Sequence, residues 1–183
     1  MIDEVVEKYL KLYPEDRQKL TLLLDQIAKG DDLSDRTNYT GHITGGAVVF
    51  APNKKKVLLV DHPTLEYWLQ PGGHWDKPEA GPWETSEREL VEETGVKIEK
   101  RLYLNNDHRI PILIDSHVIP TRPPKNEPQH FHHDFKYAFL AQSEELSMHD
   151  KVIEVAEWVE IDDPKVNEVL KDTVNRLAPL LNS

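Results

Sequence analysis

Three glutamates at helical spacing constrain what this chain can fold into and what it can bind. Glu89, Glu92 and Glu93 lie at positions i, i+3 and i+4, so their carboxylates share one face of a helix. Pro82 suits the first helical position and Gly95 suits the position just past the end, which brackets a helix of about three turns. Like charges this close destabilise a helix unless cations neutralise them, and hard divalent cations prefer carboxylate oxygens.

Two neighbouring features favour a metal site over a solvated acidic face, which is the simpler interpretation of three glutamates alone. Arg88 lies next to Glu89 and four residues before Glu92, so its guanidinium can neutralise and orient one carboxylate and leave the others free for metal. The segment Pro71-Gly72-Gly73 precedes the helix. Its backbone can approach a metal or a phosphate closely, because glycine has no side chain.

The segment from Gly73 to Val96 resembles the Nudix box, G-x5-E-x7-R-E-U-x-E-E-x-G-U, in which U is a bulky apolar residue. Gly73 and Glu79 match its first part, and residues 88–96 match every fixed position of its second part. Eight residues follow Glu79 before the second part begins, where the box has seven. We expect the inserted residue to bulge within the loop 80–82 and to leave the helix register unchanged, and it leaves the role of Glu79 open.

The resemblance implies hydrolysis of a phosphoanhydride in a nucleoside diphosphate that is linked to another group. It implies Mg²⁺ or Mn²⁺ as the cofactor, held by Glu89, Glu92 and Glu93 with help from the backbone carbonyl of Gly72. It also implies that Arg88 orients a catalytic glutamate. Bound metal would neutralise phosphate oxygens, lower the pKa of water and stabilise the leaving phosphate.

A general base could come from Glu89 or Glu92, or from a glutamate outside the box. Glu154 and Glu157 are candidates for an extra base, because they come just before Trp158 in a late strand-like segment. An ordinary exposed strand glutamate is the simpler interpretation of each.

Several of the nine histidines gather in one part of the chain. If the segment that contains them is a strand, His130, His132 and Asp134 share one face. His117 lies on the preceding strand-like segment and can face His130 or His132 across an antiparallel pair. With His74, which follows the glycine pair, these histidines are candidate substrate-binding residues, since imidazole suits a phosphate-contacting or metal-contacting wall. Their pattern is similar to that of a Nudix subgroup of unassigned substrate, and a solvated strand face explains it equally well.

The apolar pattern before residue 40 differs from the pattern after it. Apolar residues at helical spacing over 5–13 and 20–27 indicate two helices packed as a hairpin. We therefore expect an N-terminal helical extension over residues 1–38, packed on a Nudix hydrolase domain over residues 39–183.

Strand-like segments dominate the centre of the chain. Strands are expected over 43–50, 57–60, 67–69, 97–105, 110–119, 131–141 and 154–161, and a closing helix over 164–181. A strand-rich centre with helices inserted and appended indicates an α/β (α+β) fold with a mixed sheet. The resemblance implies more narrowly a Nudix-like α/β/α sandwich with a mixed β-sheet.

Charge and composition exclude several functions. The net charge of −11 argues against DNA and, more weakly, against long RNA as a partner. The chain has no cysteine, which removes zinc fingers and thiol nucleophiles and argues against an isopentenyl-diphosphate isomerase-like activity, which in that family relies on a cysteine. No apolar run approaches the roughly 20 residues that span a bilayer, and no signal-peptide pattern opens the chain. We therefore expect a cytoplasmic protein with no membrane partner.

The expected partner is a small-molecule nucleotide or another diphosphate, and a homodimer is compatible with the sequence. The alternative function is a Nudix-fold nucleotide-binding or sensor module without hydrolysis. The complete set of Arg88, Glu89, Glu92 and Glu93 argues against that alternative, because a pure binder has no need of all four. The pattern leaves open which diphosphate compound is the substrate and how many metal ions bind.

Overall fold

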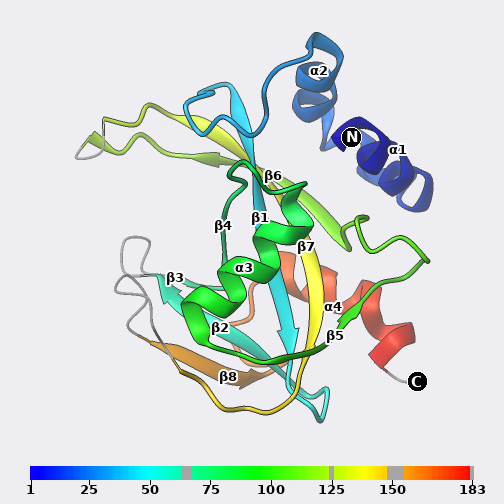
Figure 1. Ribbon diagram of the computed structural model, residues 1–183, viewed down its shortest axis with the longest axis vertical. Helices are drawn as coiled ribbons and strands as arrows, with labels where there is room; N and C mark the ends of the chain where they lie inside the picture. Colours follow the sequence, from blue (N-terminus) through cyan, green and yellow to red (C-terminus); the bar gives the residue numbers. More distant parts are fainter. Residues whose placement is uncertain (63–66, 124–125, 148–154, 182–183) are drawn as a thin grey trace.

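The computed structural model describes residues 1–62, 67–123, 126–147 and 155–181. The sheet has the order β3-β2-β1-β7-β5, with β4 paired to β1, β6 to β7 and β8 to β2 (Figure 1). The strands are β1 (Gly41–Phe50), β2 (Lys56–His62), β3 (Tyr67–Leu69), β4 (Gly72–His74), β5 (Ile98–Leu102), β6 (Leu113–Ile119), β7 (His130–Ala141) and β8 (Ala156–Glu160). The helices are α1 (Ile2–Leu12), the 3₁₀ turn η1 (Pro14–Gln18), α2 (Thr21–Lys29), α3 (Pro82–Thr94) and α4 (Glu168–Leu181).

The expected mixed sheet is confirmed, and its centre is a long parallel pair. β1 and β7 run in parallel from the Gly41/Phe131 pair to the Phe50/Leu140 pair, whereas the other pairings between the described strands are antiparallel. Every residue of β1 is buried. A strand covered on both faces is mostly apolar or glycine-rich, as the sequence GHITGGAVVF is apart from His42 and Thr44.

Side chains of β1 alternate between two hydrophobic clusters, one on each face of the sheet. Ala47 and Val49 join the cluster that contains Leu90 of α3 and the apolar residues of α1 and α2. Val48 joins the cluster that α4 covers. Figure 1 shows α3 across one face of the sheet and α4 behind the other. The expected sandwich of helices around a mixed sheet is therefore confirmed.

Several boundaries differ from the expectations. The segments expected over 97–105 and 110–119 shorten to β5 and β6, and the closing helix begins at Glu168 rather than at residue 164. The side chain of Asn167 accepts a hydrogen bond from the backbone N–H of Leu170 (2.9 Å), which is an N-cap. Val166 precedes this cap yet is buried, so it extends the apolar stripe beyond the helix itself.

β4 is a strand that the sequence did not predict. Its glycines pair with the glycines of β1, as Gly73 with Gly45 and Gly72 with Gly46. A Cβ on Gly72 would lie 2.7 Å from the carbonyl oxygen of Gly45, which is closer than real side chains come. Two glycine pairs without side chains look like a loop in the sequence, but they permit this close backbone approach.

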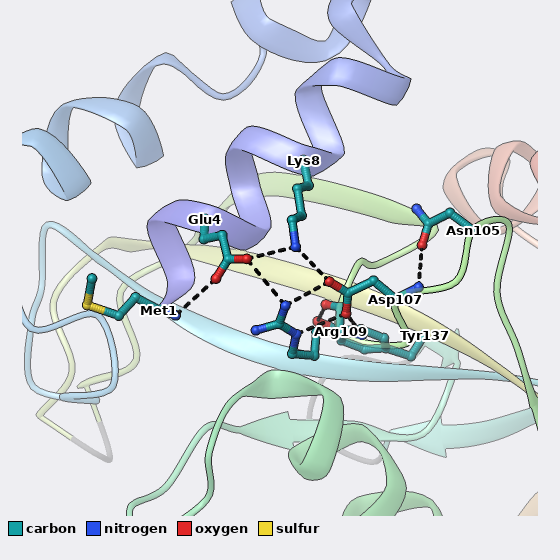
Figure 2. Close-up of polar contacts among 7 residues, drawn as sticks. All are labelled: Met1, Glu4, Lys8, Asn105, Asp107, Arg109 and Tyr137. Carbon is teal, nitrogen blue, oxygen red and sulfur yellow. Dashed lines mark hydrogen bonds and ion pairs between the residues drawn. The ribbon is translucent and has the colours of Figure 1, made fainter.

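An ion-pair network fixes α1 to the loop before β6 (Figure 2). Lys8 binds Glu4 (2.7 Å) and Asp107 (3.0 Å), and Arg109 binds Asp107 (2.8 Å). The hydroxyl of Tyr137 donates to the carbonyl of Arg109 (3.0 Å), which joins the network to β7. Hydrogen bonds from Arg109 hold the pKa of the Asp107 carboxyl well below its usual range.

A buried network joins the N-terminal helices to α4. The guanidinium of Arg176 binds the Asp16 carboxylate (2.9 Å) and the Tyr9 hydroxyl (3.0 Å), and Tyr9 donates to Asp16. Burial alone would raise the pKa of Asp16, but the hydrogen bonds from Arg176 and Tyr9 lower it overall. Asp16 is 1% exposed, so its charge depends chiefly on these two partners, with a longer ion pair to the exposed Lys19. None of the helices within the described ranges has both the length and the apolar character needed to cross a membrane.

We predict that Arg176→Met lowers the free energy of unfolding by about 3 kcal/mol, because it leaves the buried Asp16 carboxylate with only the exposed Lys19, at 3.7 Å, as a cation. Urea denaturation measures the change. The matched control is Lys171→Met, which breaks an ion pair with the exposed Glu168 on the same helix and should leave the midpoint nearly unchanged. Equal effects of the two substitutions would contradict a stabilising role for the buried network.

Candidate functional site

A cavity of about 430 Å³ lies where β1, β4, β6, β7 and α3 meet. Five of the residues expected at the site line it, namely Gly72, His74, Glu93, His117 and His132. Further polar lining comes from Thr44, Gln70, Asp115, Arg122, Asp134, Lys136 and Asn167. The cavity therefore joins the end of the acidic helix to the histidine-bearing strands, which are far apart in the sequence.

Local sequence fixes the position of α3. Pro82 opens the helix, and Gly95 closes it with a φ of 65°, in the left-handed region that glycine favours. The helix packs directly on β1, because a Cβ on Gly45 would lie 2.5 Å from the carbonyl oxygen of Pro82. Leu90 is buried in the core. This anchoring turns Glu89 and Glu93, at i and i+4, toward β4.

Arg88 holds three carboxylates rather than the one expected. Its guanidinium binds Glu79 (2.5 Å), Glu89 (2.8 Å) and Glu92 (3.0 Å). A further bond runs to the backbone carbonyl of His74 (3.3 Å), which ties the helix to the end of β4. Arg88 is therefore the centre of the carboxylate cluster.

Glu79 is part of this cluster despite the inserted residue. Its carboxylate also accepts hydrogen bonds from the Thr85 hydroxyl (2.7 Å) and the backbone N–H of Asp76 (3.2 Å). Because α3 begins at Pro82, the inserted residue lies in the preceding loop and the spacing of the helical glutamates is unchanged. Contact with Arg88 and Thr85 fits a positioning role for Glu79.

The two glycines of β4 contact the other carboxylates. The backbone N–H of Gly72 donates to Glu93 (3.1 Å). A Cβ on Gly73 would lie 2.1 Å from Oε1 of Glu89, so this position leaves no room for a side chain. Burial raises the pKa of Glu89, and the neighbouring carboxylates of Glu92 and Glu79 add to that rise, although Arg88 opposes it.

The donor chemistry of this cluster suits a hard divalent cation. Three carboxylates, from Glu79, Glu89 and Glu92, lie around one guanidinium, and the carboxylate of Glu93 lies at the backbone N–H of Gly72. The raised pKa of Glu89 indicates that one positive charge does not compensate for burial and repulsion. Carboxylate and carbonyl oxygens are the ligands that Mg²⁺ and Mn²⁺ prefer. The residues present therefore fit the cofactor that the sequence implies.

A buried ion pair forms part of the cavity wall, and sequence reasoning missed it. Lys136 and Asp134 are in direct contact, with side chains 4% and 9% exposed. Asp134 also accepts hydrogen bonds from Thr44 (3.2 Å) and Gln70 (3.1 Å). The period-two pattern that placed His130, His132 and Asp134 on one face extends to Lys136, and that extension was the available signal.

The histidines lie where the strand interpretation put them, and they divide between two cavities. His117 is opposite His132 in the antiparallel β6–β7 pair, and its ring also contacts the Asp115 carboxylate (3.0 Å). Burial, with the nearby imidazoles, lowers the pKa of His132 to about 2, and burial lowers that of His74 to about 4. His130 lies in a smaller adjoining cavity. At neutral pH, His132 and His74 are therefore uncharged.

The two extra base candidates have different outcomes. Glu154 lies outside the described residues. Glu157 lies on β8, opposite Leu59, and forms an ion pair with Lys165. It is not among the described residues that line the cavity.

We predict that Gly73→Ala destabilises the chain by about 1–3 kcal/mol, because the new methyl group overlaps the Glu89 carboxylate. In a Glu89→Ala background, the same change should have little effect, since the overlapping group is gone. Urea midpoints of the four proteins complete this double-mutant cycle. An equal loss in both backgrounds would show that Glu89 does not pack against Gly73.

Most of the chain is similar to known proteins. The family model described as the NUDIX domain matches residues 41–181. A protein of Lactococcus lactis subsp. cremoris (strain MG1363), named "Probable DHNTP pyrophosphohydrolase", is 30% identical over 135 residues, which cover 73% of this chain and 75% of that protein.

Solved structures share the fold. A NUDIX family hydrolase from Clostridium perfringens is 23% identical, with a TM-score of 0.58 over 76% of this chain and 97% of that one. The NUDIX domain of Shewanella oneidensis NrtR, complexed with ADP ribose, is 20% identical, with a TM-score of 0.54 over 85% and 98% of the two chains. A C. elegans Ap4A hydrolase binary complex is 15% identical, with a TM-score of 0.51 over 76% and 97%.

Proposed function

Since this chain belongs to the NUDIX family and is a Nudix pyrophosphohydrolase, we propose that it hydrolyses a phosphoanhydride in a nucleoside diphosphate linked to another moiety, with Mg²⁺ or Mn²⁺ as cofactor. The observation that carries this proposal is the carboxylate cluster around Arg88, which adjoins a cavity of about 430 Å³ through Gly72, Gly73 and Glu93. Cavities of about 300–1,000 Å³ are typical of small-molecule sites.

The metal would be held by the carboxylates of Glu89, Glu92 and Glu93 and the backbone carbonyl of Gly72. When bound, it supplies neutralisation of the phosphate oxygens and a more acidic water. Arg88 orients Glu89 and Glu92 by direct hydrogen bonds. We assign acceptance of the proton of the attacking water to Glu89 or Glu92, the two helical carboxylates that Arg88 orients.

The cavity that would take the substrate is lined by both positively and negatively charged side chains. Arg122 and Lys136 supply cationic lining, although Asp134 neutralises much of the charge of Lys136. His74, His117 and His132 form an imidazole wall that can donate or accept hydrogen bonds. We assign the phosphates to the side of Glu93 and the remaining moiety to the histidine wall.

The relatives narrow the substrate classes worth testing. The Lactococcus lactis relative carries DHNTP in its name, and two of the three solved structures named above carry ADP ribose and Ap4A in their descriptions. We propose a small-molecule nucleotide or related diphosphate compound as the substrate, with DHNTP first in the panel because that relative matches the chain at 30% identity. DNA is not proposed as a partner. The cytoplasmic location, a homodimer and the division into residues 1–38 and 39–183 remain predictions.

We predict Mg²⁺- or Mn²⁺-dependent hydrolysis of at least one compound of a panel containing DHNTP, ADP ribose, Ap4A and nucleoside triphosphates. Chromatography follows release of the phosphorylated products, because ADP ribose and Ap4A are cleaved without release of free phosphate or pyrophosphate. A chelator should abolish the release, and added metal should restore it. Binding of a nucleotide without any turnover across the panel would favour the alternative, a nucleotide-binding or sensor module without hydrolysis.

We also predict that Glu92→Gln, and separately Glu93→Gln, lowers kcat by about 10³-fold, equivalent to about 4 kcal/mol, because each removes a charged metal ligand. The fold should survive, as judged by circular dichroism. Glu99→Gln, on the exposed side of β5, is the matched control and should retain full turnover. Glu157→Gln should also retain it, because Lys165 already occupies that carboxylate. Near-normal kcat in the Glu92 or Glu93 variant would overturn the assignment.

A further inference from the structure

A cluster of imidazoles lies at the beginning of β1 and β7, beside the main cavity. The parallel register pairs His42 of β1 with His132 of β7, and His130 lies two residues before His132 on the same face. The ring centroids are 4.7 Å apart for His42 and His132, 5.0 Å for His42 and His130, and 5.1 Å for His130 and His132. Three rings from two neighbouring strands therefore converge on one point.

The nitrogen atoms of these rings have the spacing of metal ligands. One ligand atom from each of His42, His130 and His132 lies within 4.8 Å of the other two. The Nε2 atoms of His130 and His132 are 3.2 Å apart. A tetrahedral zinc ion with bonds of about 2.0–2.1 Å holds its nitrogen ligands about 3.3 Å apart. That pair already has the required separation, and a small movement of the His42 ring completes the set.

Backbone carbonyls fix which nitrogen of two rings carries the proton. Nδ1 of His130 lies 2.8 Å from the carbonyl oxygen of Pro128, and Nδ1 of His42 lies 3.3 Å from that of Asn38. A carbonyl only accepts, so each Nδ1 is protonated and each Nε2 has a free lone pair. Metal-bound histidines commonly have such a second hydrogen bond.

Nε2 of His42 is a buried acceptor that needs a partner. His42 is 2% exposed, and no hydrogen-bond partner for this atom lies among the described residues. A proton on Nε2 of His132 would satisfy the contact with His130 but would leave His42 unpaired. One metal ion would satisfy all three nitrogens together.

The surroundings leave room for an ion and a fourth ligand. A cavity of about 50 Å³ adjoins the three rings and is also lined by His74, Arg36, Arg122 and Glu127. Arg36 and Arg122 oppose a cation, whereas Glu127 favours one. Since two arginines and one glutamate line this cavity, its positive side chains favour an anion or hydroxide as the fourth ligand of the metal ion. Three imidazoles select zinc and similar first-row transition metals over Mg²⁺, which prefers oxygen.

We propose that the Nε2 atoms of His42, His130 and His132 bind one divalent transition-metal ion of the zinc type. This site is separate from the carboxylates of α3, and the inference does not rest on the hydrolytic function. His74 and Arg122 line both cavities, so the ion lies behind a wall of the main cavity.

Metal binding to the full chain tests the proposal. The protein is stripped with a chelator and titrated with Zn²⁺ by calorimetry in excess Mg²⁺, which occupies the oxygen ligands of Glu89 to Glu93. One Zn²⁺ should bind per chain. His42→Ala and His132→Gln should each weaken it by about 10²-fold or more, because loss of a ligand costs at least as much as loss of an outer-shell partner. His108→Ala, at an exposed histidine, is the matched control and should leave the affinity unchanged.

Co²⁺ supplies a second readout, since its visible absorption reports four-coordinate nitrogen ligation. The Co²⁺ spectrum should appear in the wild type and in Glu93→Gln and should be lost in His132→Gln, with thermal melts confirming that each variant is folded. No Zn²⁺ binding in excess Mg²⁺ would overturn the proposal, as would binding that Glu93→Gln abolishes and the histidine variants retain. Binding of inorganic phosphate to the metal-free protein, lost in Arg122→Ala and kept in His42→Ala, would replace the metal site with an anion site.

Discussion

The parallel pairing of β1 with β7 is the constraint on which the rest of the structure depends. It holds ten consecutive residue pairs in register at the centre of the sheet. Through this register, Thr44 lies beside Asp134 and His42 lies beside His132, although about 90 residues separate them in sequence. The polar wall of the cavity and the imidazole cluster are both products of this pairing. A shift by one residue would turn each of these side chains to the opposite face.

Glycine contacts convert this sheet into a site. Because Gly45 and Gly46 of β1 have no side chains, the backbone of β4 can pair closely with β1 along one edge. For the same reason α3 can pack directly on the face of β1 at Gly45. As a result, the carboxylates of α3 reach the backbone of Gly72 and the space beside Gly73. Arg88 then compensates part of the repulsion that this close arrangement creates. The remaining charge imbalance is the physical reason why we propose a divalent cation at this place.

The sequence was sufficient for the local features of this site. Pro82, Gly95 and the glutamate spacing predicted α3, and the alternation around His130 predicted which side chains share a face of β7. Long-range features were beyond it. The parallel register that brings His42 into the cluster pairs two strands that are far apart in the sequence, so no local pattern predicts it. Strand β4 was missed for a different reason, because its Gly-Gly segment has no alternation of apolar and polar residues. The Asp134–Lys136 pair was within reach, because it continues the same alternation. Glu157 was a candidate base because it comes just before Trp158 in a late strand. In the structure its carboxylate instead forms an ion pair with Lys165 on the adjacent turn.

We propose that the α3 carboxylates hold the catalytic metal, and anomalous diffraction from crystals grown with Mn²⁺ locates such an ion. Our prediction is an anomalous peak within coordination distance of carboxylate oxygens from Glu89, Glu92 or Glu93 and of the carbonyl of Gly72. A Mn²⁺ peak elsewhere in the molecule, with none at these oxygens, would contradict it.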